Sequence, residues 1–186
     1  MHSHSSHHHE LFDVEPDYSL TVYDLALQAL FDARKHTSVA IHLDFRSTDG
    51  NFLRWLSLSS AYWPECSLQV RSLSFLGYID TEKHKTLLQS TPYLKHLTFD
   101  SCGALNLKEL TQYIEPGLHS FELDGAFCLG SELSFFFNRH QNSMARVKMS
   151  DVSISEDNWP ELEQLMREMP NRKEVDLFNL GVHSGF

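Results

Sequence analysis

A short apolar motif recurs five times along the chain and limits the folds that it can adopt. The motif is six residues long, with apolar residues at its first, fourth and sixth positions, and the copies span residues 70–75, 94–99, 118–123, 144–149 and 172–177. Only the last copy replaces the first apolar residue by a cation. The fourth positions lie 24, 24, 26 and 28 residues apart, at Leu73, Leu97, Phe121, Val147 and Val175. This period predicts a solenoid in which each unit supplies one strand and one helix.

The composition limits the class of partner. The chain has 186 residues, 41% of them hydrophobic, which is enough for one domain with a substantial core. Its formal net charge of −10 disfavours nucleic acid and anionic membrane as partners, since both need a basic face. The sequence contains neither a long apolar run nor a signal peptide pattern, so we expect a cytoplasmic or nuclear protein.

The chain is predicted to consist of a disordered tail and one domain. Residues 1–17 begin with a segment that contains five histidines and no apolar periodicity. This tail is either featureless or a loose transition-metal site, because neutral imidazoles suit zinc, copper and nickel. Residues 18–186 are predicted to form a single repeat domain with an N-terminal capping helix. Three cysteines without a paired spacing indicate neither a disulfide framework nor a zinc site.

Apolar spacing predicts the helices between the strands. A helix over residues 19–36 is expected to bury Val22, Leu25, Ala26, Ala29 and Leu30, which follow helical spacing. A helix followed by a loop is predicted over residues 51–66, with Pro64 as its end. Further helices are predicted over 81–89, 106–114 and 132–140, and one more begins at Ser155 or Asp157. Every connection between strands therefore has room for a helix, as parallel strands require.

A sixth strand is predicted ahead of the five repeats. Residues 38–45 alternate around Ile41 and Leu43, and Ile41 is taken as the counterpart of Leu73. Alternate side chains of a strand point to opposite faces, so the residues between the apolar positions should form the concave face of the solenoid. The predicted partner-binding residues on that face are Asp44, Leu76, His96, Asp100, Glu122, Asp124, Arg146, Lys148, Glu174, Asp176 and Phe178.

The acidic residues of this face permit two interpretations. Asp100 and Asp124 should stand side by side, with Glu122 close and Asp44 farther along the same row. Such a row either meets a basic peptide or a cation, or is neutralised internally by Arg146 and Lys148 on the next strand. Leu76 and Phe178 flank the charges as two apolar contact residues.

Catalytic signatures are missing from the sequence. Neither the common nucleotide-binding and hydrolase motifs nor the H-E-x-x-H metalloprotease motif occurs, and we predict no catalytic residue and no cofactor. The alternative from another class is a small metal-dependent enzyme that uses His96, Asp100 and Glu122. Asp100, Glu122 and Asp124 also have the oxygen ligands that Ca²⁺ or Mg²⁺ prefers.

The second half of the chain resembles a known family. From Leu133, a phenylalanine-rich helix ends at His140, an apolar strand pattern follows, and Trp159-Pro-Glu-Leu162 comes next. This order resembles the leucine-rich-repeat region of fungal F-box-like proteins, over roughly residues 65–180. In that family the repeats recruit a substrate, and an N-terminal F-box docks the adaptor of a cullin-type ubiquitin ligase. The L-P-x-E-[LI] pattern of an F-box does not occur before the first predicted helix, so the resemblance covers the repeats alone.

Together these features predict an α/β fold and a binding function. The expected fold is a leucine-rich-repeat-like solenoid, a short horseshoe with parallel strands on the concave face and helices on the convex face. Such a fold serves protein–protein interaction rather than catalysis, and the resemblance adds substrate recognition for a ubiquitin ligase. Self-association through the last strand is a further expectation, because that strand has an open edge. A truncated or remnant repeat protein is the alternative.

Overall fold

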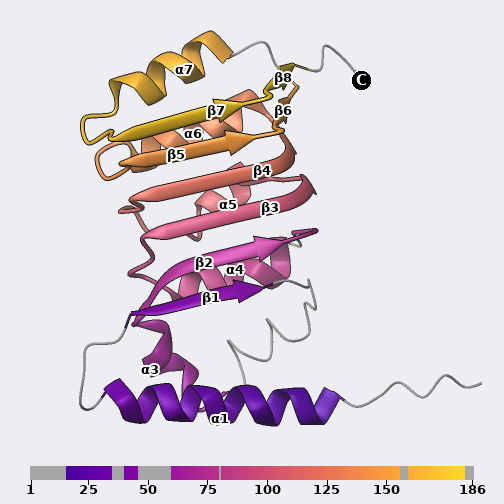
Figure 1. Ribbon diagram of the computed structural model, residues 1–186, viewed down its shortest axis with the longest axis vertical. Coiled ribbons are helices and arrows are strands. Elements are labelled where there is room, and N and C mark those ends of the chain that lie inside the picture. The colour runs from indigo at the N-terminus through magenta and orange to yellow at the C-terminus, as the bar shows by residue number, and fades with distance from the viewer. Residues whose placement is uncertain (1–15, 35–39, 46–59, 80, 156–158, 183–186) are drawn as a thin grey trace, which may run out of the picture.

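Six strands lie side by side in one sheet, in the order in which they occur in the chain, except for a short strand that leaves this path (Figure 1). The computed structural model describes residues 16–34, 40–45, 60–79, 81–155 and 159–182. Neighbouring strands are parallel, and the sheet is not closed. Its strands are β1 (Ile41–Phe45), β2 (Val70–Leu76), β3 (His96–Ala104), β4 (Ser120–Cys128), β5 (Arg146–Ser150) and β7 (Glu174–Phe178). Two-residue strands, β6 (Ser153–Ile154) and β8 (Gly181–Val182), extend the sheet beside the end of β4.

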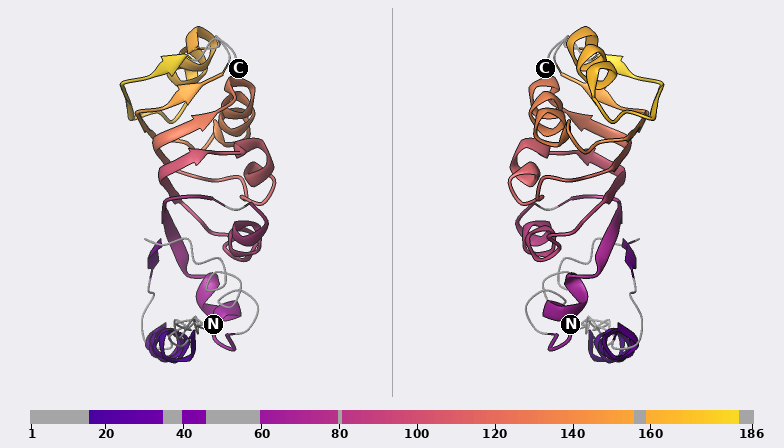
Figure 2. Two further views of the ribbon diagram at one scale, coloured as in Figure 1. Left: turned by 90° about the vertical axis from the view of Figure 1, so that its right-hand side faces the viewer. Right: turned by 90° about the vertical axis from the view of Figure 1, so that its left-hand side faces the viewer.

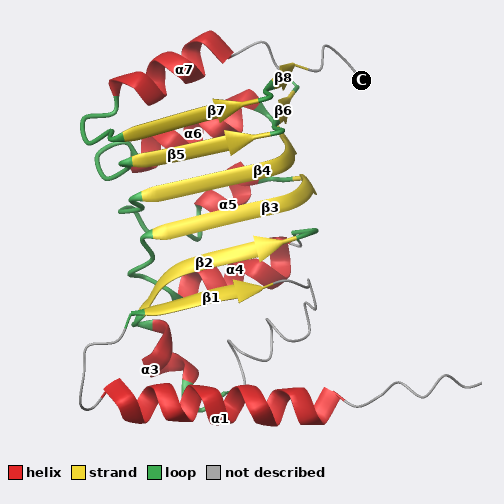
Figure 3. Cartoon of the chain, viewed as in Figure 1, coloured by secondary structure: helices red, strands yellow, loops and turns green. Residues whose placement is uncertain are grey.

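Helices cover one face of this sheet and leave the other without a covering element in the described part of the chain. Figure 2 shows the helices that connect successive strands in one layer behind the sheet, and Figure 3 shows the same two layers by element type. The helices are α1 (Pro16–Arg34), α3 (Trp63–Ser67), α4 (Thr81–Ser90), α5 (Leu107–Thr111), α6 (Gly130–His140) and α7 (Trp159–Glu168). The predicted α/β fold with parallel strands is therefore confirmed.

The apolar motif sets the register of the sheet. Leu73, Leu97, Phe121, Val147 and Val175 occupy equivalent positions on five adjacent strands. The first four of these side chains are at most 2% exposed, because the helices pack against this face. Phe75, Phe99 and Phe121 continue the packing with ring centroids 5.7 and 6.3 Å apart. Burial of one repeated set of side chains thus aligns the strands.

The connecting helices bury the faces that their spacing predicts. Asn106 caps α5 by accepting a hydrogen bond from the Glu109 N–H at 3.1 Å, and Leu107, Leu110 and Ile114 are buried. The predicted inward residues of the helices on either side are also buried, namely Leu87, Leu88, Leu133, Phe136, Phe137, Leu162 and Met166. Helix α7 is described from Trp159 onward, and residues 156–158, which include the predicted start at Asp157, lie outside the described residues.

The predicted inward face of the first helix is only partly correct, because Leu30 packs against the core whereas Leu25, Ala26 and Ala29 do not. Helix α1 crosses the β1 end of the sheet beside α3 (Figure 1) and buries Leu27, with Leu30 and Phe31 packed against the core. Leu25 is 60% exposed, and Ala26 and Ala29 are exposed as well. Both sets follow helical spacing, and the helix turns its larger side chains inward because they bury more apolar surface.

Two predictions near β1 and β2 are also wrong. Pro64 lies in the first turn of α3 instead of ending a helix, a position where a missing N–H is harmless. In β1, Leu43 pairs with Leu73, while Ile41 pairs with Val70 across an irregularity between Ile41 and His42. Residues 51–59 of the predicted 51–66 segment lie outside the described residues, as does most of the predicted tail, residues 1–15.

Candidate protein-binding face

Three rows of side chains cross the face of the sheet that the helices leave uncovered, which we call the open face. The first row, nearest the strand starts, contains His42, Ser72, His96, Ser120, Arg146 and Glu174. The second row contains Asp44, Ser74, Thr98, Glu122, Lys148 and Asp176. The third row contains Leu76, Asp100, Asp124, Ser150 and Phe178. Every predicted partner-binding residue lies in one of these rows, and all are exposed or partly exposed.

Charge is segregated along the strand direction of the open face. Arg146 of the first row lies near a line of cations at the strand starts, formed by Arg71, Lys95 and Lys173. The second and third rows carry the acidic residues Asp44, Asp100, Glu122, Asp124 and Asp176, with Lys148 as their one cation. Apart from Glu174 in the first row, the open face is therefore bipolar, with a positive side at the strand starts and a negative side toward the strand ends.

The histidines on the positive side respond to this field. Partial burial lowers the pKa of His96, and the neighbouring charge of Arg146 lowers it further. The pKa of His119, at the second motif position before β4, is lowered by partial burial and then by the charges of Lys95 and Lys173. Both imidazoles consequently favour the neutral form, because protonation would add a positive charge to a region that is already positive.

The predicted acidic pair is present, but its row is composed differently. Asp100 and Asp124 stand in register on β3 and β4, which confirms the prediction. Asp44 is not in their row; it pairs with Ser74 and belongs to the row of Glu122. The reason is that Leu43, and not Ile41, occupies the position of Leu73, which places Asp44 one row closer to the strand starts.

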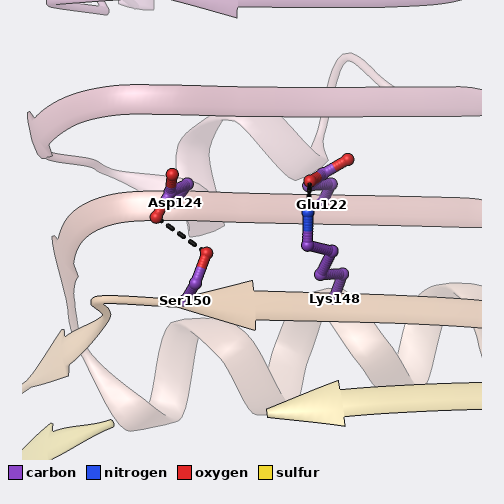
Figure 4. A network of polar contacts seen from close by, with 4 residues as sticks. All are labelled: Glu122, Asp124, Lys148 and Ser150. Atoms are coloured by element: carbon purple, nitrogen blue, oxygen red, sulfur yellow. Dashed lines mark hydrogen bonds and ion pairs between the residues drawn. The ribbon is translucent and has the colours of Figure 1, made fainter. Parts of the chain in front are cut away.

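Internal neutralisation reaches only part of the acidic side. Lys148 forms an ion pair with Glu122 across β4 and β5 (Figure 4), and this contact raises the pKa of Lys148. Asp124 accepts a hydrogen bond from the Ser150 hydroxyl at 2.7 Å, and Asp100 accepts one from the Ser101 hydroxyl at 2.8 Å. Within the described residues neither aspartate forms an ion pair, so their two neighbouring charges stay on the surface.

Two apolar side chains lie at the ends of the third row. Leu76 on β2 is 36% exposed and Phe178 on β7 is 67% exposed. Between them lie Asp100, Asp124 and Ser150. The third row therefore offers apolar contacts at its two ends and negative charge in its middle, a combination that suits recognition of another surface.

The described residues of the open face form no metal-binding cluster. No group of three or more His, Cys, Asp or Glu side chains within the described residues is placed to hold a metal ion. A small cavity lies beyond the ends of β3 and β4, away from the rows, and is lined by Phe127, Cys128 and the buried Glu132 among others. Burial raises the pKa of the Cys102 and Cys128 thiols to about 12, which keeps them protonated and unreactive.

The sequence reasoning missed the positive side of the face. Its signal is the second position of the repeat motif, which reads Arg71, Lys95, His119, Ala145 and Lys173. These residues precede the alternating positions of the strands, so a list restricted to outward strand residues leaves them out. The repeat therefore encodes a charged line as well as an apolar one.

Comparison with known proteins does not identify a family or a function for this chain. No protein-family model matches the sequence, and no curated protein matches it at a significant level. Of the helices in the described part of the chain, none offers an apolar stretch that could cross a lipid bilayer.

Proposed function

We propose that this chain is a short leucine-rich-repeat-like solenoid and a non-enzymatic module that binds a protein partner on the open face. The observation that carries the proposal is the segregation of charge over three aligned rows that no described element covers. Surfaces of stacked parallel strands are extended, so they suit a macromolecule better than a small substrate. Two surface aspartates side by side repel each other, and a partner with cations opposite them would remove this repulsion.

The charge pattern specifies the chemistry of the partner. A bound segment would place acidic residues over the positive side, near Lys95 and Arg146, and basic residues over Asp100 and Asp124. Apolar side chains of the partner would contact Leu76 and Phe178 at the ends of the third row. Such opposite charges fix the orientation of a partner more than they add affinity.

The resemblance to fungal F-box-like proteins gives this proposal a specific form. In that form the open face recognises a substrate for a ubiquitin ligase in the cytoplasm or nucleus. A nucleic-acid partner does not fit, since the net charge is −10 and the acidic rows would oppose a phosphate backbone.

Capture of partners by matched variants tests the proposal. The first variant carries Asp100→Lys, Glu122→Lys and Asp124→Lys on the open face. The second carries Glu115→Lys, Glu161→Lys and Glu168→Lys, which are exposed acids outside the strands and give the same change in net charge. Circular dichroism and thermal unfolding first establish that both variants fold.

We expect the wild type and the second variant to retain the same partner, and the first variant to lose it. Recovery of ubiquitin-ligase subunits with that partner would support the substrate-recognition form. Equal retention by both variants would contradict binding through the open face, because a net-charge effect would not distinguish them.

A further inference from the structure

The last strand of the sheet ends the stack with its apolar side chains only half buried. Val175 and Leu177 on β7 are partly exposed, whereas their neighbours Val147 and Met149 on β5 are 2% and 0% exposed. A cavity of about 480 Å³ lies beside β7 and α7, and its lining includes Val175, Leu177, Asp176 and Arg172. The core of the repeat therefore continues to this edge and stops without a covering neighbour in the described residues.

The backbone of β7 is free on the same side. The Glu174 N–H donates to the Ala145 carbonyl at 3.1 Å, and the Phe178 carbonyl accepts from the Asp151 N–H at 3.1 Å, both toward β5. Because backbone groups alternate sides along a strand, the N–H and carbonyl groups of Val175 and Leu177 point away from β5. Among the described strands, β5 alone pairs with β7. The edge thus presents hydrogen-bonding groups and half-buried apolar side chains together.

Strand β5 shows which sequence fits against β7. Its Arg146 and Lys148 stand opposite Glu174 and Asp176, and its Val147 and Met149 stand opposite Val175 and Leu177. The free edge of β7 offers the same acidic and apolar positions to a strand on its other side. Opposite charges on adjacent strands and apolar pairs both stabilise such an arrangement.

We propose that the free edge of β7 binds an extended segment of a partner protein in which cationic and apolar residues alternate, as in Arg-Val-Lys-Met. The segment adds to the sheet as a further parallel strand, a known mode of peptide recognition. Its cations face Glu174 and Asp176, and its apolar side chains lie beside Val175 and Leu177, where Glu163 and Arg167 of α7 also line the cavity. This site shares Glu174 and Asp176 with the open face, but it uses the backbone edge of β7, which binding across the open face does not require.

A second copy of the chain is a poorer occupant of the same edge. Two β7 strands related by a two-fold axis would run antiparallel. With the axis at Val175, Glu174 of each copy faces Asp176 of the other, and with the axis at Asp176 the two Asp176 side chains face each other. An axis at Glu174 places the two Glu174 side chains together and brings Arg172 opposite Asp176. Like charges directly opposite each other destabilise a strand pair.

A labelled peptide with the sequence of residues 144–150, Met-Ala-Arg-Val-Lys-Met-Ser, is the probe, and fluorescence anisotropy is the readout. We expect saturable binding of this peptide to the full chain. The peptide with Arg146→Glu and Lys148→Glu should bind with an affinity lower by a factor of about ten or more. The protein variant Glu174→Lys with Asp176→Lys should lose a similar factor. The matched variant Glu115→Lys with Glu161→Lys changes two exposed acids outside the strands, has the same net charge and should bind the peptide as the wild type does.

Amide exchange of the unmodified protein gives a second test that needs no variant. Addition of the peptide should slow exchange at Val175 and Leu177, whose amides point to the free edge, and leave the open-face rows unchanged. Equal affinity for the two peptides, or unchanged exchange at these amides, would overturn the proposal. A concentration-dependent dimer with protected Val175 and Leu177 amides would also overturn it and would assign the edge to a second copy.

Discussion

The centre of the sheet and its β7 end carry the same motif but bury it to different extents. In the centre, Leu97 and Phe121 are 1% and 0% exposed, with a strand on each side and a helix layer behind. At the end, Val175 occupies the position equivalent to theirs, Leu177 occupies the position equivalent to the buried Leu123, and both are partly exposed. The motif therefore fixes which side chains point inward, while neighbouring units decide how completely they are buried, as in repeat proteins generally.

The largest expected effect is the difference in stability loss between an alanine substitution in the centre of the sheet, at Phe121, and one at its β7 end, at Leu177. Phe121→Ala should lower the free energy of unfolding by about 3–5 kcal/mol, because it removes a fully buried ring that packs against Phe136 at 4.3 Å. Leu177→Ala should cost about 1 kcal/mol, since its side chain is already partly in water. Urea unfolding of both variants provides the measurement. Equal costs would contradict a core that weakens toward β7.

A buried histidine in the central helix layer should make stability depend on pH. Burial lowers the pKa of His140 to about 4, and neither ring nitrogen has a hydrogen-bond partner. The unfolded chain takes up the proton near pH 6.5, whereas the folded chain does so only near pH 4. The free energy of unfolding should thus fall by about 3 kcal/mol as the pH drops through this interval.

The variants His140→Phe and His96→Phe compare how a histidine of the covered helix layer and a histidine of the open face contribute to the pH dependence of stability. His140→Phe should abolish most of the pH dependence and stabilise the protein, since an unpaired buried imidazole is replaced by a ring that suits the contact with Phe136. His96→Phe should leave most of it, because His96 is only partly buried. Thermal unfolding between pH 7 and pH 4 provides the comparison, and identical pH profiles for the two variants would contradict it.

Two glycines, in the later parts of β3 and β4, allow the cost of a left-handed backbone conformation to be compared with the added cost of a close contact. Gly125 has a φ of +57°, and a Cβ there would lie 3.2 Å from the Ser101 Cα, whereas Gly103 has a φ of +63° and open space. Gly103→Ala should cost about 1 kcal/mol for the left-handed conformation, and Gly125→Ala about 2 kcal/mol because the backbone of Ser101 must also shift. Similar unfolding free energies for the two variants would contradict this, because they would show that the contact between the new Cβ and Ser101 costs no stability.

The smallest effect on stability is expected on the open face. Glu122→Gln removes the ion pair with Lys148 while keeping the shape of the side chain. Exposed ion pairs contribute little, so the urea midpoint should not change, although partner binding at the acidic rows should weaken. A large loss of stability would mean that this pair maintains the sheet and is not available for recognition.

Sequence patterns predicted the parts of the fold that repeated burial controls. Leu73, Leu97, Phe121 and Val147 align because each needs a place in the same core, and the helices between them follow from their own spacing. The same patterns failed at α1, where apolar residues occupy more than one face, so that Leu27 is buried and Leu25 is exposed. They also failed at β1, where Ile41 was aligned with Leu73 although Leu43 and Phe45 hold the fourth and sixth motif positions.

The candidate site was predicted in composition but not in charge pattern. The outward residues of the strands follow from alternation, and the Asp100 and Asp124 pair follows from the repeat spacing. The positive side was missed because Arg71, Lys95 and Lys173 precede the alternating positions. Its existence became evident once the strand register placed these residues near one edge of the same sheet.

Site-specific photo-crosslinking tests the central claim of binding through the open face most directly. A photoreactive phenylalanine derivative is placed at Thr98, in the middle of the second row, and in a separate protein at Lys108, an exposed position on α5. The account predicts that a protein partner crosslinks from position 98 and not from position 108. Crosslinking from position 108 alone, or equally from both, would contradict it.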